Sequence, residues 1–417
     1  MCTLDYGAES MQNRKLLLFL MDGVGDRPIP ELNNKTPLEA AKTSTMDKLA
    51  QMGITGQQHT IGRGITPGSD TAHLALFGYN PYEVYTGRGP YEASGTDLPV
   101  KPGDIAFRTN MATIKDGIIV DRRAGRISKG TEEIEKALQN ITIEDVETIF
   151  KVGIDHRAAL VLRGPGLASE VTGNDPKVEG KRPKSIISTS PEAEKTARIL
   201  KQYIRQASEI METLKINEKR ISEDKLPANY LLVRGAGKAP HVESFQSKYG
   251  LTAECVAGGG LYKGVASICG MKINNDHQGT GGIPTDLPSK VRAAIKSLER
   301  SQFVFLHVKG TDNLGHDNKP IQKMEFIDEI DIAIEPFLDL IPETLICITG
   351  DHSTPCMMRD HSSDPLPILM TGEGVRPDQV TEFGERPTMR GGLGHIDGQQ
   401  VIPIMLGLIG RVHKFGA

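Results

Sequence analysis

The sequence predicts an α/β fold built on a doubly wound, mostly parallel sheet, and short apolar runs are the main reason. Three runs of six residues are apolar almost throughout rather than alternating: Leu16–Met21, Phe303–Val308 and Thr344–Thr349. Continuous apolar runs are typical of strands that helices cover on both faces. Helical patterns over Leu287–Arg300 and Ile321–Leu340 precede the second and third runs. This alternation of strand and helix favours a parallel sheet.

Each of the three apolar runs is followed closely by glycine and aspartate. The aspartates are Asp22, Asp312 and Asp351. An Asp-Gly pair after one strand is ordinary turn chemistry. In parallel sheets, however, ligands bind at the carboxyl ends of the strands. Because the pattern recurs at three strands, and a histidine follows two of them, we interpret it as a functional edge.

The middle of the chain follows a different pattern, which predicts an inserted domain over residues 104–280. The core is then discontinuous and comprises residues 1–103 and 281–417. The middle carries its own strands and a long charged helical stretch, which predict a smaller α/β or α+β domain. The expected strands and helix are Met111–Ile114, Ala158–Leu162, Tyr230–Val233 and Pro191–Lys219.

Composition excludes several classes of protein. The net charge is −4 over 417 residues, which argues against nucleic-acid binding through a basic face. Five cysteines, an odd number with no CxxC pair, exclude a disulfide scaffold. No apolar run approaches a membrane span, and Leu16–Met21 is too short for a secretion signal. We therefore expect a cytoplasmic protein with neither membrane nor nucleic-acid partners.

Candidate metal ligands gather after the predicted strands and in one glycine-rich loop. Asp312 and His316 stand four residues apart, which places both on one face of a helical turn. Mixed Asp and His ligation suits zinc or manganese, whereas magnesium alone favours oxygen ligands. Three Asp and three His side chains could fill two sites, a common arrangement for phosphoryl transfer. The six candidates are Asp22, Asp312, His316, Asp351, His352 and His395.

Ser69 is the best candidate for a nucleophile. It follows the Pro67-Gly68 turn and precedes a helix-compatible apolar pattern. A helix N-terminus there would favour a phosphoryl group through its free N–H groups and dipole. A neighbouring cation would help the hydroxyl to lose its proton. The alternative is that Ser69 merely caps the helix, which is a common role for serine.

Five segments of the chain carry specific sequence motifs: Asp22-Gly23-Val24-Gly25-Asp26, Pro67 to His73, Tyr79 to Pro90, Lys309 to His316 and Thr349 to Pro355. Together they resemble the archaeal-type cofactor-independent phosphoglycerate mutases, which belong to the alkaline phosphatase superfamily. The resemblance runs over nearly the whole chain and includes Asp121 to Arg126 in the expected insertion and Gly394-His395 near the end.

The resemblance implies an alkaline phosphatase-like core with an inserted substrate domain. It implies that Asp312, His316 and His395 hold one divalent metal ion. Asp22, Asp351, His352 and the Ser69 oxygen would hold the other. Manganese is the first choice for both ions, with zinc, cobalt and magnesium as alternatives. The implied reaction is the glycolytic interconversion of 3-phosphoglycerate and 2-phosphoglycerate without bisphosphoglycerate, with the phosphoryl group carried on Ser69.

A mutase of this kind must hold glycerate and exclude water, which an insertion that closes as a lid would achieve. Arginine binds phosphate and carboxylate through two parallel hydrogen bonds. For each basic residue the alternative is a solvated surface charge. The candidates for substrate binding are Arg122, Arg123, Arg126, His156, Arg157, Arg234, Lys263 and Arg88.

Two other activities remain open on the same metal core. One is a phosphohydrolase or phosphodiesterase, and the other is a phosphotransferase between different small molecules. A silent binding protein is disfavoured by the complete set of ligands. The basic insertion argues against a plain hydrolase, which gains nothing by excluding water. The sequence does not indicate an oligomeric state.

Overall fold

The computed structural model describes residues 13–139, 141–412, 414 and 416. They form two compact units. One unit combines the described residues up to Glu83 with those from Glu243 onward, and the other spans Val84–Val242. The chain therefore leaves its first unit, builds the second and returns. Within the described residues, no helix is long and apolar enough to cross a membrane.

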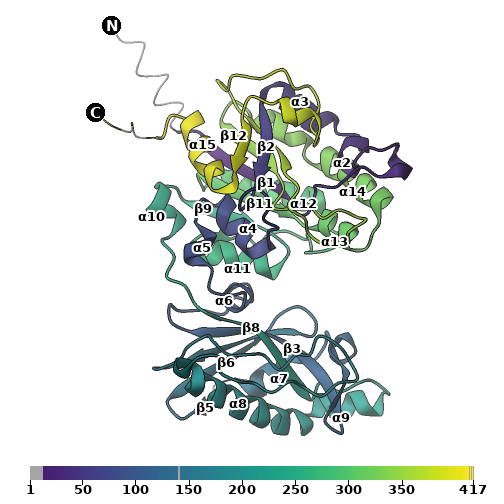
Figure 1. Ribbon diagram of the computed structural model, residues 1–417, viewed down its shortest axis with the longest axis vertical. Helices are drawn as coiled ribbons and strands as arrows, with labels where there is room; N and C mark the ends of the chain where they lie inside the picture. The colour runs from purple at the N-terminus through teal and green to yellow at the C-terminus, as the bar shows by residue number, and fades with distance from the viewer. Residues whose placement is uncertain (1–12, 140, 413, 415, 417) are drawn as a thin grey trace. The chain divides into compact units, whose positions relative to one another are not determined.

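The first unit is built on an eight-stranded sheet in the order β10-β9-β11-β1-β12-β13-β2-β14 (Figure 1). All neighbouring pairs are parallel except those of β13, which runs opposite to β12 and to β2. The mostly parallel α/β sheet expected from the sequence is thus confirmed. The strands are β1 (Lys15–Met21), β2 (Gly53–His59), β9 (Ala253–Val256), β10 (Lys272–Ile273), β11 (Phe303–Val308), β12 (Thr344–Thr349), β13 (Leu366–Thr371) and β14 (Gly394–Asp397).

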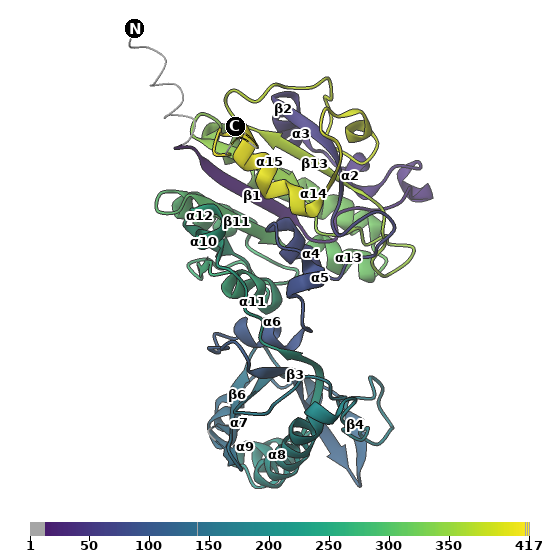
Figure 2. The same cartoon turned by 60° about the vertical axis from the view of Figure 1, so that its left-hand side comes forward.

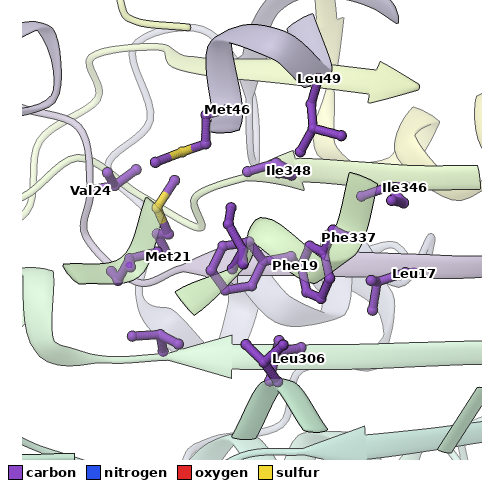
Figure 3. Close-up of a cluster of buried hydrophobic side chains, with 14 of the residues drawn as sticks. Leu17, Phe19, Met21, Val24, Met46, Leu49, Leu306, Phe337, Ile346 and Ile348 are labelled. Atoms are coloured by element: carbon purple, nitrogen blue, oxygen red, sulfur yellow. The ribbon is translucent and has the colours of Figure 1, made fainter. Parts of the chain in front are cut away.

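Helices cover both faces of this sheet. On one face Leu17, Phe19 and Leu306 pack into a large apolar cluster with side chains from the covering helices (Figure 3). On the other face Phe305 meets Phe77 just beyond α4, with ring centroids 4.9 Å apart. Burial on both sides explains why these strands are apolar throughout. The helices are α2 (Pro37–Ala40), α3 (Ser44–Gln51), α4 (Ser69–Leu76), α5 (Pro81–Val84), α10 (Phe245–Tyr249), α11 (Gly260–Ile268), α12 (Leu287–Leu298), α13 (Gly310–His316), α14 (Pro320–Ala333) and α15 (Val401–Leu408).

The second unit has an antiparallel sheet, which makes it the α+β form of the expected smaller domain. The order is β4-β3-β7-β6-β5, and β8 also pairs with β3. Helices α7 and α8 bury their apolar residues against this sheet (Figure 2). The elements are α6 (Gly89–Ser94), β3 (Ile105–Lys115), β4 (Ile118–Asp121), α7 (Thr131–Leu138), β5 (Ile141–Ile143), β6 (Val146–Val152), β7 (Arg157–Arg163), α8 (Glu194–Glu212), α9 (Lys215–Ser222) and β8 (Tyr230–Lys238).

The observed boundaries differ from the expected insertion, 104–280, at both ends. The segment after Val84 belongs to the second unit, since α6 packs on β3. The segment from Glu243 to residue 280 belongs to the first unit, because β9 pairs with β11 in its sheet. Strand β9 is only four residues long and lacks a following Asp-Gly pair, so nothing in the sequence marked it as part of the core sheet.

Candidate active site

The first cluster of candidate ligands forms where β1 and β12 end side by side. Asp22 follows β1, and Asp351 and His352 follow β12; all three side chains are buried. The Oδ1 atom of Asp351 accepts hydrogen bonds from the backbone N–H groups of Gly23 and His352, each at 3.0 Å. One potential ligand atom from each of the three side chains lies within 4.8 Å of the others. The adjacent strand ends predicted from the sequence therefore do bring these residues together.

Ser69 lies beside this first cluster. It is the first residue of α4, as the Pro-Gly turn before it predicted. Its Oγ atom is 3.3 Å from Nε2 of His352, and its side chain is buried. One turn later, the Nδ1 atom of His73 donates a hydrogen bond to the Ser69 carbonyl oxygen at 2.6 Å. The hydroxyl is thus held between a helix N-terminus and the candidate ligands.

A second cluster consists of Asp312, His316 and His361, whose ligand atoms also lie within 4.8 Å of one another. Asp312 and His316 both come from α13, one turn apart, as their spacing predicted. The Oδ1 atom of Asp312 is 3.3 Å from Nε2 of His316 and 3.6 Å from Nε2 of His361. His361 comes from the loop between β12 and β13.

Three histidines present the same ring nitrogen to the two clusters. The Nδ1 atoms of His316 and His361 donate to the carbonyl oxygens of Arg359 and Pro67, at 2.8 Å and 2.9 Å. A carbonyl oxygen only accepts, so in each case Nδ1 carries the hydrogen. The Nδ1 atom of His352 lies 3.0 Å from the Thr354 hydroxyl. Second partners of this kind fix ring orientation in metal-binding histidines and leave Nε2 to face the metal.

Thr354 and Lys309 connect the two clusters. The Thr354 hydroxyl donates to Oδ1 of Asp312 at 2.8 Å while it contacts His352. The Lys309 ammonium donates to Oδ2 of Asp312 at 2.7 Å and lies 3.5 Å from Oδ2 of Asp22. One hydroxyl and one cation therefore span the gap between the clusters.

Burial sets the electrostatics of the first cluster. Burial and the nearby Asp22 carboxylate raise the pKa of Asp351 well above its usual value. Burial also opposes ionisation of Asp22, but Lys309, His307 and His352 outweigh it and hold its pKa low. Burial lowers the pKa of His352 to about 3. The first cluster thus pairs Asp22, which ionises readily, with Asp351, whose ionisation is opposed.

The second cluster is more accessible, and the pKa of its His316 shifts in the direction opposite to that of His352. The hydrogen bond that the His316 ring donates to Asp312 raises the pKa of His316 to about 9. Burial and Asp22 oppose ionisation of Asp312, yet His316 and Lys309 bring its pKa below the usual value. Asp22 and Asp312 therefore supply carboxylates at neutral pH, one to each cluster.

The residues of both clusters fit divalent cations. Among the residues that the structure describes, Oδ1 of Asp22 and Oδ2 of Asp351 are buried and have no hydrogen-bond partner. An unsatisfied buried carboxylate oxygen is costly unless a cation or donor meets it. These oxygens and the Nε2 atom of His352 form a mixed oxygen and nitrogen donor set, which suits manganese or zinc.

His395 does not join either cluster, contrary to expectation. It lies on β14, which pairs with β2 at the sheet edge, and its side chain is exposed. Its Nδ1 atom is 3.0 Å from Nε2 of His59. In the second cluster, His361 takes the position expected for His395. The signal for His361 in the sequence is its closeness to Asp351 and His352, which it follows within the same connection between strands.

A separate cluster of arginines forms on the second unit. Asp175 is held by Arg122 through two hydrogen bonds, of 3.0 and 2.6 Å, and lies 3.5 Å from Arg234. Glu92 lies 2.8 Å from Arg88 and 3.3 Å from Arg108. The structure thus brings together Arg88, Arg122 and Arg234 of the expected set and adds Arg108.

Cations outnumber anions in this arginine cluster. Burial, together with the Arg234, Arg88 and Arg157 charges, outweighs Glu92 and lowers the pKa of Arg108 to about 10. Burial, then Arg157 and Arg123, lower the pKa of His156 to about 4, so that imidazole is neutral. An excess of guanidinium groups around two carboxylates suits an anionic ligand. The sequence does contain a signal for Arg108, because it is a single charged residue within an otherwise uncharged part of strand β3.

Three of the expected basic residues lie elsewhere or make no such contact. Arg126 is exposed, with a left-handed backbone (φ 56°) next to Gly125. Arg123 is exposed, and its backbone N–H donates to Asp121. Lys263 lies on α11 of the first unit, where its ammonium donates to Asn275 at 2.7 Å. Within the described residues, none of these three side chains forms an ion pair with Asp175 or Glu92.

The partly buried carboxyl group of Glu385 gives a testable prediction. Burial raises the pKa of Glu385 to about 7 from 4.5. Its carboxyl group accepts hydrogen bonds from the Asp26 N–H and the Thr36 hydroxyl. As pH rises from about 4.5 to 7, the unfolded chain loses this proton first, so this group lowers the free energy of unfolding over that window. Glu385→Gln should remove this contribution, worth up to about 3 kcal/mol.

The measurement is urea unfolding of both proteins at pH 5 and pH 8. The free energy of unfolding of Glu385→Gln should rise relative to wild type between these two values. Parallel changes in the two proteins would show that Glu385 is already ionised in the folded state.

Comparison with known proteins now adds independent information. The family model for 2,3-bisphosphoglycerate-independent phosphoglycerate mutase matches residues 50–217. A protein of that name from Pyrococcus abyssi is 48% identical over 408 residues, covering 97% of this chain and 100% of the relative. One from Thermococcus kodakarensis is 48% identical over 411 residues, covering 98% and 100%.

Solved structures agree with these relatives. A protein from Pyrococcus horikoshii superposes with a TM-score of 0.85 at 41% identity, covering 97% of this chain and 100% of that one. The cofactor-independent phosphoglycerate mutase from Thermoplasma acidophilum gives 0.73 at 36% identity, covering 95% and 100%. The resemblance noted in the sequence motifs is confirmed. Identity at this level over nearly the whole length shows that the chain belongs to the family of 2,3-bisphosphoglycerate-independent phosphoglycerate mutases.

Proposed function

We propose that this chain interconverts 3-phosphoglycerate and 2-phosphoglycerate in glycolysis through a phosphoserine on Ser69. One observation carries the proposal. A buried serine hydroxyl at a helix N-terminus lies 3.3 Å from a histidine of a cluster with two unsatisfied carboxylate oxygens. This arrangement combines a nucleophile, a donor set for cations and free backbone N–H groups. Phosphoryl transfer needs all three.

Two divalent ions complete the proposed site. Asp22, Asp351, His352 and Ser69 would hold one ion, and Asp312, His316 and His361 the other. Manganese is our first choice, with zinc, cobalt or magnesium as alternatives. When bound, the ions would neutralise the phosphoryl oxygens and favour ionisation of the Ser69 hydroxyl.

The residues of the chain perform the transfer itself. The Ser69 hydroxyl loses its proton as its oxygen attacks phosphorus, and the bond from phosphorus to the substrate's 3-oxygen breaks. That oxygen gains a proton as glycerate forms. Glycerate then offers its 2-hydroxyl, which loses a proton and takes the phosphoryl group back from Ser69. The α4 N-terminus and the Lys309 ammonium offset the negative charge on the moving group.

We further propose that the arginine cluster of the second unit binds the substrate's carboxylate or phosphate. Arg234 and Arg108 are partly or mostly buried, which strengthens their hydrogen bonds to an anion. Retention of glycerate during the phosphoserine stage separates a mutase from a phosphatase. The substrate is thus the small molecule phosphoglycerate.

The four described cysteines are buried free thiols, which supports a reducing, cytoplasmic location.

The deciding experiment is an assay of the purified, manganese-loaded protein with 3-phosphoglycerate and without bisphosphoglycerate. Formation of 2-phosphoglycerate with little free phosphate would support the mutase. Mostly free phosphate would instead support a phosphohydrolase. Transfer only to an added second acceptor would support a phosphotransferase. A chelator should abolish turnover, and manganese should restore it.

The arginine cluster makes a prediction about the product ratio. Arg234→Ala should lower mutase turnover and raise the ratio of free phosphate to 2-phosphoglycerate, because glycerate escapes before the return transfer. Hydrogen bonds to charged groups are worth about 1.5–3 kcal/mol, so we expect a loss of about 10- to 150-fold in kcat/KM. Both products should be measured at matched metal content.

Arg126→Ala is the matched control, since it removes an exposed arginine of the same unit that forms no ion pair with Asp175 or Glu92 among the described residues. It should behave like wild type. An unchanged product ratio in Arg234→Ala, or an equal change in both variants, would show that the cluster does not retain glycerate.

A further inference from the structure

Lys323 is a buried lysine near the start of α14 whose three hydrogens all have acceptors. Its side chain is fully buried. The ammonium donates to Oδ2 of Asp26 at 2.9 Å and to the carbonyl oxygens of Thr354 and Gly25 at 3.0 and 3.2 Å. An ammonium group has three hydrogens to donate, so this one is fully satisfied. A buried charge with such complete pairing is held in one position.

The acceptors belong to two loops that carry candidate ligands. Gly25 and Asp26 lie on the loop that begins with Asp22, and Thr354 lies on the loop that begins with Asp351. The two loops also bond to each other directly. The Thr354 N–H donates to the Gly25 carbonyl at 3.0 Å, and the Cys356 N–H donates to Oδ1 of Asp26 at 3.1 Å.

The two ligand loops are tightly packed where they cross, at Gly25 and Ser353. A β-carbon added at Gly25 would lie 2.1 Å from the Ser353 hydroxyl, so only glycine permits so close an approach. Lys323 lies beneath the crossing and bonds to both loops at once. The lysine thus holds together two segments that are more than 300 residues apart in the sequence.

Thr354 connects the hydrogen bonds of Lys323 to candidate ligands in both clusters. Its carbonyl oxygen accepts from Lys323, while its hydroxyl contacts Oδ1 of Asp312 and Nδ1 of His352. Asp312 belongs to one cluster and His352 to the other. A shift of the Thr354 backbone would therefore disturb both clusters together.

We propose that Lys323 is a positioning residue for both metal clusters. Its ammonium fixes the two ligand loops against α14 and so sets the spacing at which the clusters bind their ions. The inference rests on the proposed two-metal function and adds to it a residue that touches neither metal nor substrate. Partners that orient metal ligands typically change metal affinity by about 10- to 100-fold when lost.

The test measures binding of Mn²⁺ alone to the full-length, metal-free protein, followed by electron paramagnetic resonance. The first variant is Lys323→Met combined with Asp26→Asn, because the second change prevents an unpaired buried carboxylate. The second variant is Lys323→Gln, which keeps two of the N–H donors and is easier to fold. We expect the affinity for at least one ion to fall by about tenfold or more in both variants.

Asp331→Asn is the matched control. Asp331 lies on the same helix and is 1% exposed, but it accepts from the N–H groups of Thr45 and Met46, which belong to α3 and to neither ligand loop. It should lose stability while it keeps wild-type Mn²⁺ affinity. Raising the Mn²⁺ concentration should restore kcat in the Lys323 variants, with KM for 3-phosphoglycerate little changed.

The outcomes separate the two proposals. If wild type binds two ions and both Lys323 variants bind them equally tightly, the positioning role is wrong and the proposed function stands. An equal loss of affinity in Asp331→Asn would also overturn it, since the effect would then be general destabilisation. If wild type itself binds no pair of ions, the two-metal function is wrong, and the inference fails with it.

Discussion

Ser69→Ala should lower mutase turnover by on the order of 10⁴-fold or more while the protein still folds and binds metal. The substitution removes the proposed acceptor of the phosphoryl group. It leaves the carboxylate and imidazole groups of both clusters in place. The His73 hydrogen bond also survives, because it is made to the Ser69 backbone carbonyl. Turnover and metal content should be measured on the same preparation.

Trapping the proposed phosphoserine tests this prediction more directly. Wild type quenched during turnover with 3-phosphoglycerate should carry phosphate on the peptide that contains Ser69, and the alanine variant should carry none. Thr71→Ala is a suitable control, because this hydroxyl lies on the same helix and donates only to the Gly68 carbonyl. A large residual activity in Ser69→Ala would show that Ser69 merely caps α4.

His361→Ala should remove one of the two metal ions and most of the activity. The Nε2 atom of His361 is 3.6 Å from Oδ1 of Asp312, and its Nδ1 atom is held by the Pro67 carbonyl. Alanine leaves only Asp312 and His316 in that cluster. Since the proposed transfer needs both ions, we expect turnover to fall by about two orders of magnitude or more.

His395→Ala is the comparison that decides between the two histidines. Its imidazole lies against His59 at an exposed edge, so the variant should keep both ions and nearly full activity. Metal content by mass spectrometry and turnover would be measured for each variant. Loss of an ion in His395→Ala, with none lost in His361→Ala, would support the ligand set expected from the sequence.

The parts of the site that the sequence predicted are those encoded over a few neighbouring residues. Strands β1 and β12 are continuous apolar runs, and Asp22 and Asp351 follow them almost directly. Parallel pairing then places both ends at one edge. The one-turn spacing of Asp312 and His316 is likewise local.

The parts that were missed depend on contacts between distant segments. His361 presents its Nε2 atom because its ring bonds to Pro67, 294 positions away. No periodic pattern encodes such a contact. Lys323 lies in a stretch correctly predicted as helical, yet its complete burial depends on two loops that cross above it. Strand β9 was missed because four residues give too short a signal.

The reversed direction of β13 has an entropic consequence for metal binding. A parallel return to the sheet would need a long crossover, whereas an antiparallel strand follows its neighbour through a direct connection. Residues 350–365 therefore leave β12 and enter β13 at the same edge of the sheet. This one tethered segment supplies Asp351 and His352 to the first cluster and His361 to the second. Because both of its ends are anchored in strands, much of its conformational freedom is lost before any cation binds, which leaves less ordering to oppose uptake of the ions.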